Sequence, residues 1–587
     1  MNKEDQKKSL DWELLKRILR LGFPYKRVFI IAGILAVIIA PIASFRPYLI
    51  QLMVDDYIMD SDLRGMATIT GILFLLLVGE VLLRYWFIYS TNLLGQSVIK
   101  DLRVRVFKHI TNMNVSYFDR TPIGTSTTRT INDIETINTV FSQGVITIIA
   151  DILGLVAVLV IMFYSSWQLS LICLSTLPLL IIASYIFKEK VKEAFQKVRT
   201  QISRMNAFLQ ERITGMRIVQ VFNAERREAD KFRLINRDYT QANIDSIFYY
   251  AVFFPAVEII SAISLGLMVW WGAGSVIGGS VTLGALIAFP VYLTMLFRPV
   301  RFMADKFNTL QMGMVAADRV FKVLDKQSEG VESGHFKPER IEGKIVFDKV
   351  WFAYEDDNYV LKDINFNIKP GETLAIVGST GSGKSTIINI INRFYEYTKG
   401  SVKVDDRELN TYDLESLRKR IAMVLQDVFL FSGSVLDNIR LNDPGISEEH
   451  VRKSAGLIKA DQFINKLPGG FDFIVAERGN NLSMGQRQLI AFVRALVFDP
   501  DLLILDEATS SVDSESEAII QYAIETLIAK RTSIIIAHRL STIRHADHIM
   551  VLSKGKIVEF GKHDELMAIT NGKFKSLYEM QFVDELT

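Results

Sequence analysis

Residues 378–386 read Gly378-Ser379-Thr380-Gly381-Ser382-Gly383-Lys384-Ser385-Thr386, directly after the apolar run Leu374–Val377. A glycine-rich turn that links a buried strand to a helix directs backbone N–H groups towards phosphate oxygens, and its lysine adds a positive charge. The glycines let the backbone turn tightly and approach a ligand without a Cβ in the way. The helix that starts near Lys384 points the positive end of its dipole at the same phosphates. We therefore predict that all nine residues of this loop bind a nucleotide.

A second apolar run, Leu502–Leu505, ends in the two carboxylates Asp506 and Glu507. Four apolar residues predict a buried parallel strand, and open α/β sheets bind ligands at the carboxyl ends of such strands. We predict that Asp506 and the hydroxyl of Ser385 hold Mg²⁺. Glu507 is placed to polarise the water that attacks the γ-phosphate of ATP. An isolated acidic strand end can be merely solvated, but the phosphate loop favours a nucleotide site.

Further motifs narrow the class of protein. Tyr354 ends the run Trp351–Tyr354, Gln426 follows the apolar run 421–425, and His538 follows the apolar run 533–537. The segment Leu482–Gln486 precedes a helix predicted to run to about Phe498. In this order the set resembles the ATPase domain of ABC transporters. The resemblance covers essentially the whole chain, because the N-terminal half is similar to the exporter-type membrane domain of the same family.

The resemblance implies a role for each motif. Tyr354 matches the aromatic residue that stacks on adenine, and Gln426 matches the glutamine that contacts Mg²⁺ or the attacking water. His538 matches the histidine that hydrogen bonds the γ-phosphate, and Ser510–Asp513 matches a loop that crosses the dimer interface. The residues predicted to take part in catalysis are Glu507, His538, Gln426 and Lys384.

The segment Leu482–Gln486 matches the family's signature motif, which contacts the ATP held by the other subunit. We predict that Ser483, Gly485 and Gln486 make these contacts. The family usually has glycine where this chain has Met484. The methionine either crowds the facing nucleotide or points away as a tolerated variant, and the sequence favours neither.

Composition and length indicate a membrane protein with several domains. The chain has 587 residues, of which 49% are hydrophobic, and its formal net charge of +2 gives no indication of a nucleic-acid partner. Six apolar stretches are long enough to cross a bilayer. They lie near 28–52, 67–89, 144–165, 167–187, 248–275 and 281–300.

The distribution of lysine and arginine predicts the orientation of these spans. Both residues are abundant near 100–130 and 188–241, whereas the loop Asp55–Arg64 is mostly acidic. The positive-inside rule then places both termini and the ATPase domain in the cytoplasm. We therefore expect a multi-pass protein of the plasma (inner) membrane.

The predicted fold is multidomain, with a six-helix all-α transmembrane domain followed by an α/β P-loop ATPase domain. The predicted boundaries are 1–26 for a cytosolic tail and interfacial helix, 27–326 for the transmembrane domain, 327–340 for a linker and 341–587 for the ATPase domain. Two long cytosolic extensions of the spans end in Tyr117–Gly124 and Phe208–Gly215, which resemble the family's coupling segments. These are expected to press on the ATPase domain and transmit a change around Gln426.

One carboxylate within the spans is the predicted substrate contact. Glu258 lies near the middle of the fifth apolar stretch, where a charge is costly unless it faces a wet cavity or a partner. The alternative is a structural hydrogen bond to a neighbouring helix.

One phosphate loop and one signature motif in the same chain imply a half-transporter, because in the family they lie on distant faces. Two chains, identical or related, would clamp ATP and Mg²⁺ between them, and ATP hydrolysis would drive alternating access. We expect export of a small amphipathic substrate, a drug or a lipid, across the lipid bilayer. A peptide or protein exporter, an ATP-gated membrane regulator and an importer are the alternatives.

Overall fold

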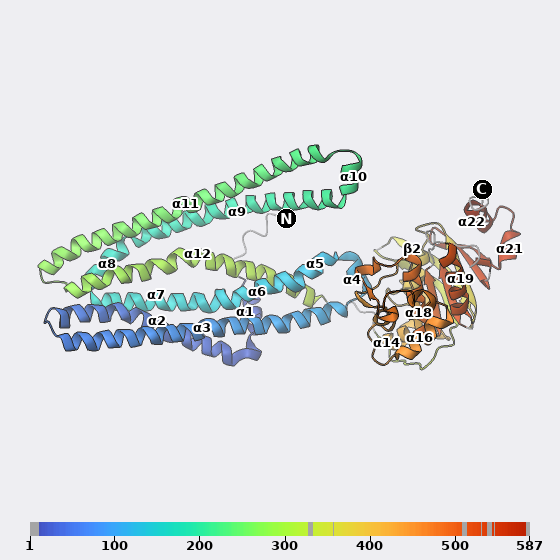
Figure 1. Ribbon diagram of the computed structural model, residues 1–587, viewed down its shortest axis with the longest axis horizontal. Coiled ribbons are helices and arrows are strands. Elements are labelled where there is room, and N and C mark those ends of the chain that lie inside the picture. Colours follow the sequence, from blue (N-terminus) through green and yellow to red (C-terminus); the bar gives the residue numbers. More distant parts are fainter. Residues whose placement is uncertain are drawn as a thin grey trace. The chain divides into compact units, whose positions relative to one another are not determined.

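The computed structural model describes residues 11–326, 333–355, 357–506, 514–529, 531–536, 543–544 and 546–582 (Figure 1). The chain forms two compact units. The first, the membrane unit, comprises Met1–Thr111 and Ile123–Lys326, and the second, the ATPase unit, comprises Asn112–Pro122 and Gln327–Thr587. The short segment 112–122 therefore belongs with the ATPase domain, although it lies between two parts of the membrane unit in the sequence.

The membrane unit contains 6 helical segments that are long and apolar enough to cross a membrane, as the sequence predicted. These are Phe23–Ile58, Leu63–Thr111, Ile123–Ser165, Trp167–Thr214, Glu225–Ile277 and Leu283–Asp325. Each has between 36 and 53 residues, whereas a bilayer needs only about 20. The segments are thus long enough to continue outside a membrane as polar helices.

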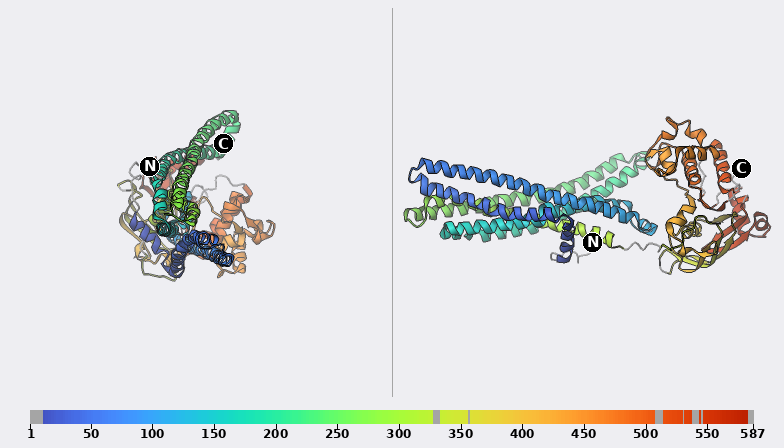
Figure 2. Two further views of the ribbon diagram at one scale, coloured as in Figure 1. Left: turned by 90° about the vertical axis from the view of Figure 1, so that its left-hand side faces the viewer. Right: turned by 90° about the horizontal axis from the view of Figure 1, so that it is seen from below.

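The helices of the membrane unit follow one another with few breaks (Figure 1). They are α1 (Trp12–Arg20), α2 (Lys26–Leu52), α3 (Leu63–Thr111), α5 (Ile123–Thr128), α6 (Ile134–Thr139), α7 (Val145–Ser165), α8 (Trp167–Ser175), α9 (Leu177–Thr214), α10 (Met216–Val221), α11 (Glu225–Ile277) and α12 (Leu283–Asp325). Figures 1 and 2 show α9 and α11 side by side, joined through α10.

The third membrane-spanning segment is irregular. Two π-helical turns, η4 (Arg129–Asp133) and η5 (Val140–Gly144), interrupt it on either side of α6. A π-helical turn inserts an extra residue into an α-helix and changes the direction of the side chains that follow. A further π-helical turn, η3 (Met53–Ile58), continues α2.

Helix α1 packs against the end of α12. Its N-cap Asp11 accepts hydrogen bonds from two backbone N–H groups, and its apolar face buries Leu15 and Ile18. Arg17 forms a two-pronged ion pair with Asp325, the last residue of α12, at 2.5 and 2.6 Å. Its guanidinium also lies 3.9 Å from the ring centre of Phe321. Helix α1 is thereby held against the C-terminal end of α12.

The ATPase unit is built on a six-stranded sheet of order β12-β11-β3-β10-β9-β6. Five neighbouring strands, from β11 to β6, run parallel to one another, and β12 is antiparallel to β11. The strands are β3 (Thr373–Gly378), β6 (Ile421–Val424), β9 (Leu502–Asp506), β10 (Thr532–Ile536), β11 (His548–Ser553) and β12 (Lys556–Gly561). A four-stranded antiparallel sheet joins β2 (Tyr359–Ile368), β1 (Ile345–Ala353), β4 (Lys399–Val404) and β5 (Arg407–Glu408), and β7 (Gly433–Ser434) pairs with β8 (Ile474–Val475).

Alternate residues of the central strands face two separate cores, as expected of a sheet that is covered on both faces. Val377, Leu503 and Ile535 belong to a core that includes helix α18, whereas their sequence neighbours Ile376 and Ile504 belong to a core that includes α13. The helices of this unit are α4 (Val115–Arg120), α13 (Lys384–Ile391), α14 (Leu414–Arg420), α15 (Val435–Arg440), α16 (Glu448–Leu457), α17 (Asp461–Ile464), α18 (Met484–Val497), α19 (Ser514–Ile528), α21 (His563–Met567) and α22 (Lys573–Phe582).

Candidate functional site

The phosphate loop links β3 to α13 through backbone conformations that favour glycine. Gly378 has φ +155° and Gly383 has φ +107°, a region that L side chains rarely adopt. A Cβ on Gly378 would lie 2.4 Å from the carbonyl oxygen of Leu552, and a Cβ on Gly383 would lie 2.7 Å from the Leu361 side chain. Both glycines are therefore required by the shape of the loop itself.

The polar groups of the loop fit a phosphate ligand. Lys384 donates hydrogen bonds from Nζ to the carbonyl oxygens of Gly378 and Ser379, at 2.7 and 3.2 Å. Burial lowers the pKa of Lys384, and the nearby carboxylate of Asp506 opposes this shift. The hydroxyl of Ser382 is buried and has no hydrogen-bond partner among the described residues. Buried polar groups are normally paired, so this hydroxyl is suited to a bound ligand oxygen.

Strand register brings the predicted metal-binding residues to one edge of the sheet. Asp506 on β9 is level with Ile536 on β10, which is level with Ile376 on β3. Val424 on β6 is level with the residue before Asp506, so that Gln426 follows at the same carboxyl edge. The loop that leaves β3 therefore begins at the same edge as Asp506, the last residue of β9, and Gln426, which lies two residues beyond the end of β6. Oxygen donors of this kind suit Mg²⁺.

Ser385 and Thr386 lie in the first turn of α13, next to Lys384. Ser385 is exposed, as a metal ligand at this helix end has to be, whereas Thr386 is buried. The hydroxyl of Tyr354 lies 3.2 Å from Oγ1 of Thr386 and accepts a hydrogen bond from Asn389 at 3.3 Å. The hydroxyl of Tyr354 thus reaches the first turn of α13, 32 residues further along the sequence.

The signature segment forms the start of α18. Ser483 is the N-cap, and a reciprocal pair of hydrogen bonds joins it to Gln486: Gln486 N–H donates to the Ser483 hydroxyl, and Ser483 N–H donates to the Gln486 side chain. This capping box fixes the helix start and leaves Ser483 exposed. Gly485 is buried and Met484 is half-buried.

The phosphate loop and the signature segment lie on opposite faces of the six-stranded sheet. The buried residues of α13, such as Ile387 and Ile390, belong to one core, and those of α18, such as Leu489 and Val493, belong to the other. The helices that begin at the phosphate loop and at the signature segment therefore pack against different faces of the sheet.

Some predicted residues lie outside the described residues. Glu507 follows the last residue of β9, His538 comes two positions after β10, and Ser510–Asp513 precedes α19. Their roles stay predictions.

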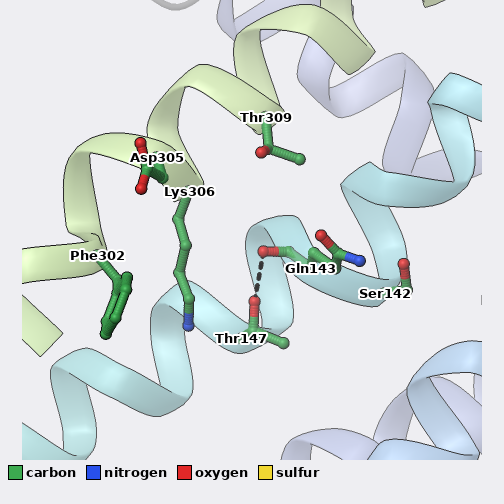
Figure 3. Close-up of a pocket in the computed structure, with 7 residues that line it drawn as sticks. All are labelled: Ser142, Gln143, Thr147, Phe302, Asp305, Lys306 and Thr309. Carbon is green, nitrogen blue, oxygen red and sulfur yellow. Dashed lines mark hydrogen bonds between the residues drawn. The ribbon is translucent and has the colours of Figure 1, made fainter. Parts of the chain in front are cut away.

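A second candidate site is a cavity of about 370 Å³ in the membrane unit (Figure 3). Its lining comes from η5, α7 and α12 and comprises Ser142, Gln143, Thr147, Phe302, Asp305, Lys306 and Thr309. Figure 3 shows Lys306 extending from α12 towards α7, where its ammonium group forms an ion pair with Asp151. Asp305 has no ion-pair partner among the described residues.

The substrate contact predicted from the sequence is Glu258. Glu258 lies on α11, is exposed, and is not among the residues that line this cavity. Asp305 and Lys306 lie beyond the sixth apolar stretch, near 281–300, in a polar part of the helix. Hydropathy alone does not show that this part faces η5, because the pairing depends on the irregular third segment.

Together, the six membrane-length helical segments and the phosphate loop indicate a membrane protein with a nucleotide-binding domain. Two family models match the chain, "ABC transporter transmembrane region" over residues 29–300 and "ABC transporter" over residues 361–510. The "Uncharacterized ABC transporter ATP-binding protein YknV" of Bacillus subtilis is 37% identical over 98% of this chain and 96% of its own length. The chain belongs to the ABC transporter family, and it couples ATP hydrolysis to transport.

Two other relatives carry more specific names. The "ATP-dependent lipid A-core flippase" of Syntrophus aciditrophicus is 34% identical over 98% of this chain and 95% of its own length. The "Probable multidrug resistance ABC transporter ATP-binding/permease protein YheH" of Bacillus subtilis is 36% identical over 89% of this chain and 77% of its own length.

Proposed function

We propose that this chain is an ATP-driven exporter of a small amphipathic substrate, a drug or a lipid, and that it works by alternating access as a dimer of half-transporters. The names of the similar flippase and multidrug proteins support this substrate class. The observation that carries the dimer is the separation of α13 and α18 on opposite faces of the sheet. A complete site needs the phosphate loop of one subunit and the signature segment of the other.

Exposed apolar side chains support a second subunit as the partner. Around α10, Ile218, Val221 and Phe222 are 63%, 74% and 73% exposed. On the ATPase domain, Phe429 and Phe431 form an exposed aromatic pair with ring centres 5.2 Å apart. Exposed apolar groups of this kind mark surfaces that are covered by a partner. We assign both to the dimer of half-transporters.

The chemistry of the nucleotide site follows from the groups at the sheet edge. Lys384 and the loop N–H groups bind the phosphates, while Ser385, Asp506 and Gln426 supply oxygen ligands for a cation. Mg²⁺, when bound, neutralises charge on the β- and γ-phosphates. Glu507 accepts a proton from the attacking water, and His538 hydrogen bonds the γ-phosphate.

The cavity in the membrane unit supports an amphipathic substrate with a positively charged or hydrogen-bond-donating head. Lys306 is neutralised by Asp151, so Asp305 is the carboxylate that remains for a ligand. Phe302, which is 45% exposed, offers an aromatic face beside it. This assignment places the head-group contact on α12 and leaves Glu258 as a second position to test.

The orientation in the membrane follows from charge. The long polar extensions of the spans carry the lysine and arginine residues, which favours a cytoplasmic ATPase domain and cytoplasmic termini. Labelling of single cysteines in intact cells and in inverted vesicles tests this topology, with Cys173 buried and therefore a silent background.

Transport by the purified full-length protein in lipid vesicles tests the function. We expect ATP-dependent movement of a cationic amphipathic dye or a fluorescent phospholipid, and its loss in Lys384→Ala. ATP hydrolysis without movement of any dye, lipid or peptide would contradict the proposal and favour a regulator. Movement of peptides alone would favour the peptide exporter.

Hydrolysis by the chain alone tests the identity of the partner. If the partner is a copy of the same chain, the purified protein should hydrolyse ATP briskly and cooperatively. If Met484 crowds the facing nucleotide, hydrolysis stays low alone and rises when Met484→Gly restores the usual signature. In that case the natural partner is a related subunit with an unaltered signature.

A further inference from the structure

Helix α4 lies in the ATPase unit although its neighbours in sequence lie in the membrane unit. Residues Asn112–Pro122 cluster with Gln327–Thr587, and Tyr117 within α4 is only 6% exposed. The first coupling segment predicted from the sequence, Tyr117–Gly124, starts here. The prediction that a short helix at this tip contacts the ATPase domain is confirmed.

The last two residues of α4 bind two tyrosines of the ATPase domain. Arg120 donates a hydrogen bond from Nη2 to the backbone carbonyl oxygen of Tyr354 at 2.8 Å. Asp119 accepts a hydrogen bond from the hydroxyl of Tyr395. Burial and this carboxylate together raise the pKa of Tyr395, so its hydroxyl stays protonated and remains a donor.

These two tyrosines are themselves in contact. Their ring centres are 4.9 Å apart at 87°, an edge-to-face arrangement, and both pack on Phe352. The hydroxyl of Tyr354 reaches the first turn of α13 through Thr386. An unbroken series of contacts therefore runs from α4 to the phosphate loop and passes through Tyr354.

We infer that Asp119 and Arg120 are positioning residues for the adenine base. They hold Tyr354 from two sides, Arg120 through its main chain and Asp119 through the ring of Tyr395. Movement of α4 therefore changes the affinity for the base, and binding of the base changes the preferred position of α4, because coupling between two sites is reciprocal. The inference rests on the proposed role of Tyr354 in binding adenine.

This assignment adds a second route to the one expected through Gln426. Gln426 lies at the carboxyl edge of the sheet beside the metal-binding residues, so it responds to the phosphate end of the nucleotide. Tyr354 responds to the base. Because α4 contacts Tyr354, it can respond differently to a complete nucleotide and to a phosphate ligand without a base. A contact at Gln426 alone would not distinguish these two ligands.

The test compares a ligand with the base and a ligand without it, using the full-length protein. Arg120→Ala should raise the KM for ATP about fivefold, the lower end of typical coupling between sites, with little change in kcat. The inhibition constant of inorganic tripolyphosphate should stay the same, because this ligand has no base. Arg120→Lys should restore much of the loss, since lysine can also donate to the carbonyl oxygen.

Two conservative variants guard against a folding defect. Asp119→Asn and Tyr395→Phe should raise the KM for ATP in the same direction without removing packing. Arg103→Ala is the matched control, because Arg103 pairs with Glu135 inside the membrane unit at 2.7 Å, and it should leave the KM unchanged. Thermal unfolding midpoints of all variants should stay close to that of the parent protein.

The outcomes separate this inference from the proposed function. In a Tyr354→Leu background, Arg120→Ala should have no further effect on the KM. An equal loss of ATP and tripolyphosphate affinity, or full additivity with Tyr354→Leu, overturns the inference while leaving the exporter in place. If Tyr354→Leu itself leaves the KM for ATP unchanged, the adenine role and the inference both fail.

Discussion

In the ATPase unit, the site residues come from the ends of neighbouring parallel strands, whereas in the membrane unit the cavity residues come from an irregular helical turn and from one face of α12. Strand pairing fixes the position of Asp506 relative to β3 at every residue. No such register exists between helices, which pack through side chains alone. The proposed ATP chemistry therefore relies on positions fixed by the sheet, whereas the proposed substrate contact relies on side-chain packing between helices.

The largest effect is expected for Glu507, the proposed general base. Glu507→Gln should keep ATP binding and lower turnover about 100- to 10,000-fold, because a positioned general base contributes that much. The measurement is single-turnover hydrolysis alongside ATP binding, with trapping of the dimer as a second readout. Normal turnover would mean that another group is the base and would weaken the contrast between the two units.

A smaller effect is expected for the backbone of the phosphate loop. Gly383→Ala places a side chain at φ +107° and should cost about 1–3 kcal/mol of backbone strain. The Leu361 side chain can shift, so the conformation rather than the contact dominates. We expect a higher KM for ATP.

The control for this variant is Gly371→Ala. Gly371 also has positive φ, at +78°, but lies before β3 and has no atoms within 4 Å of an added Cβ. This variant should lower thermal stability without a change in KM. A change in KM of equal size in both variants would show that the loop geometry is not specific to phosphate binding.

In the membrane unit, Asp305→Asn should reduce stimulation of hydrolysis by cationic amphipathic compounds about tenfold, which corresponds to the loss of a charge-assisted contact of about 1.4 kcal/mol. Stimulation curves in vesicles measure it. The matched control is Asp318→Asn, since Asp318 pairs with Lys322 on the same helix at 2.7 Å. If Glu258→Gln produces the loss and Asp305→Asn does not, the substrate contact lies on α11.

The smallest effect is expected at the membrane-unit surface. Arg17→Ala removes an ion pair whose side chains are 43% and 54% exposed, and such pairs contribute about 0.2–1 kcal/mol. The unfolding midpoint in detergent should fall by a few degrees at most, more than for Arg20→Ala on the same turn. A larger drop would show that the contact of Arg17 with Phe321 carries most of the effect.

The sequence predicts more of the ATPase site than of the membrane-unit cavity, because strand register follows from local patterns and helix packing does not. The six spans follow from hydropathy, and the phosphate loop follows from its glycines, its lysine and the apolar run before it. The meeting of Asp506 and Gln426 with the phosphate loop follows because the carboxyl ends of parallel strands lie at the same edge of a sheet. These predictions use local patterns that the fold preserves.

Other features depend on contacts that no local pattern records. The π-helical turns η4 and η5 add residues to a helix without changing its hydropathy. The ion pair of Asp151 with Lys306 joins residues 155 positions apart. The two hydrogen bonds that hold α4 in the ATPase unit, from Arg120 to Tyr354 and from Tyr395 to Asp119, likewise join residues far apart in the sequence.

The membership of Asn112–Pro122 in the ATPase unit affects any attempt to produce that domain separately. A polypeptide starting near Ser333 would omit this segment and leave the Tyr395 hydroxyl and the Tyr354 carbonyl oxygen without their partners in α4. Such a fragment should self-associate and bind nucleotide poorly. Adding a synthetic peptide of residues 112–122, or grafting that stretch onto the fragment with a flexible tether, should restore its solubility.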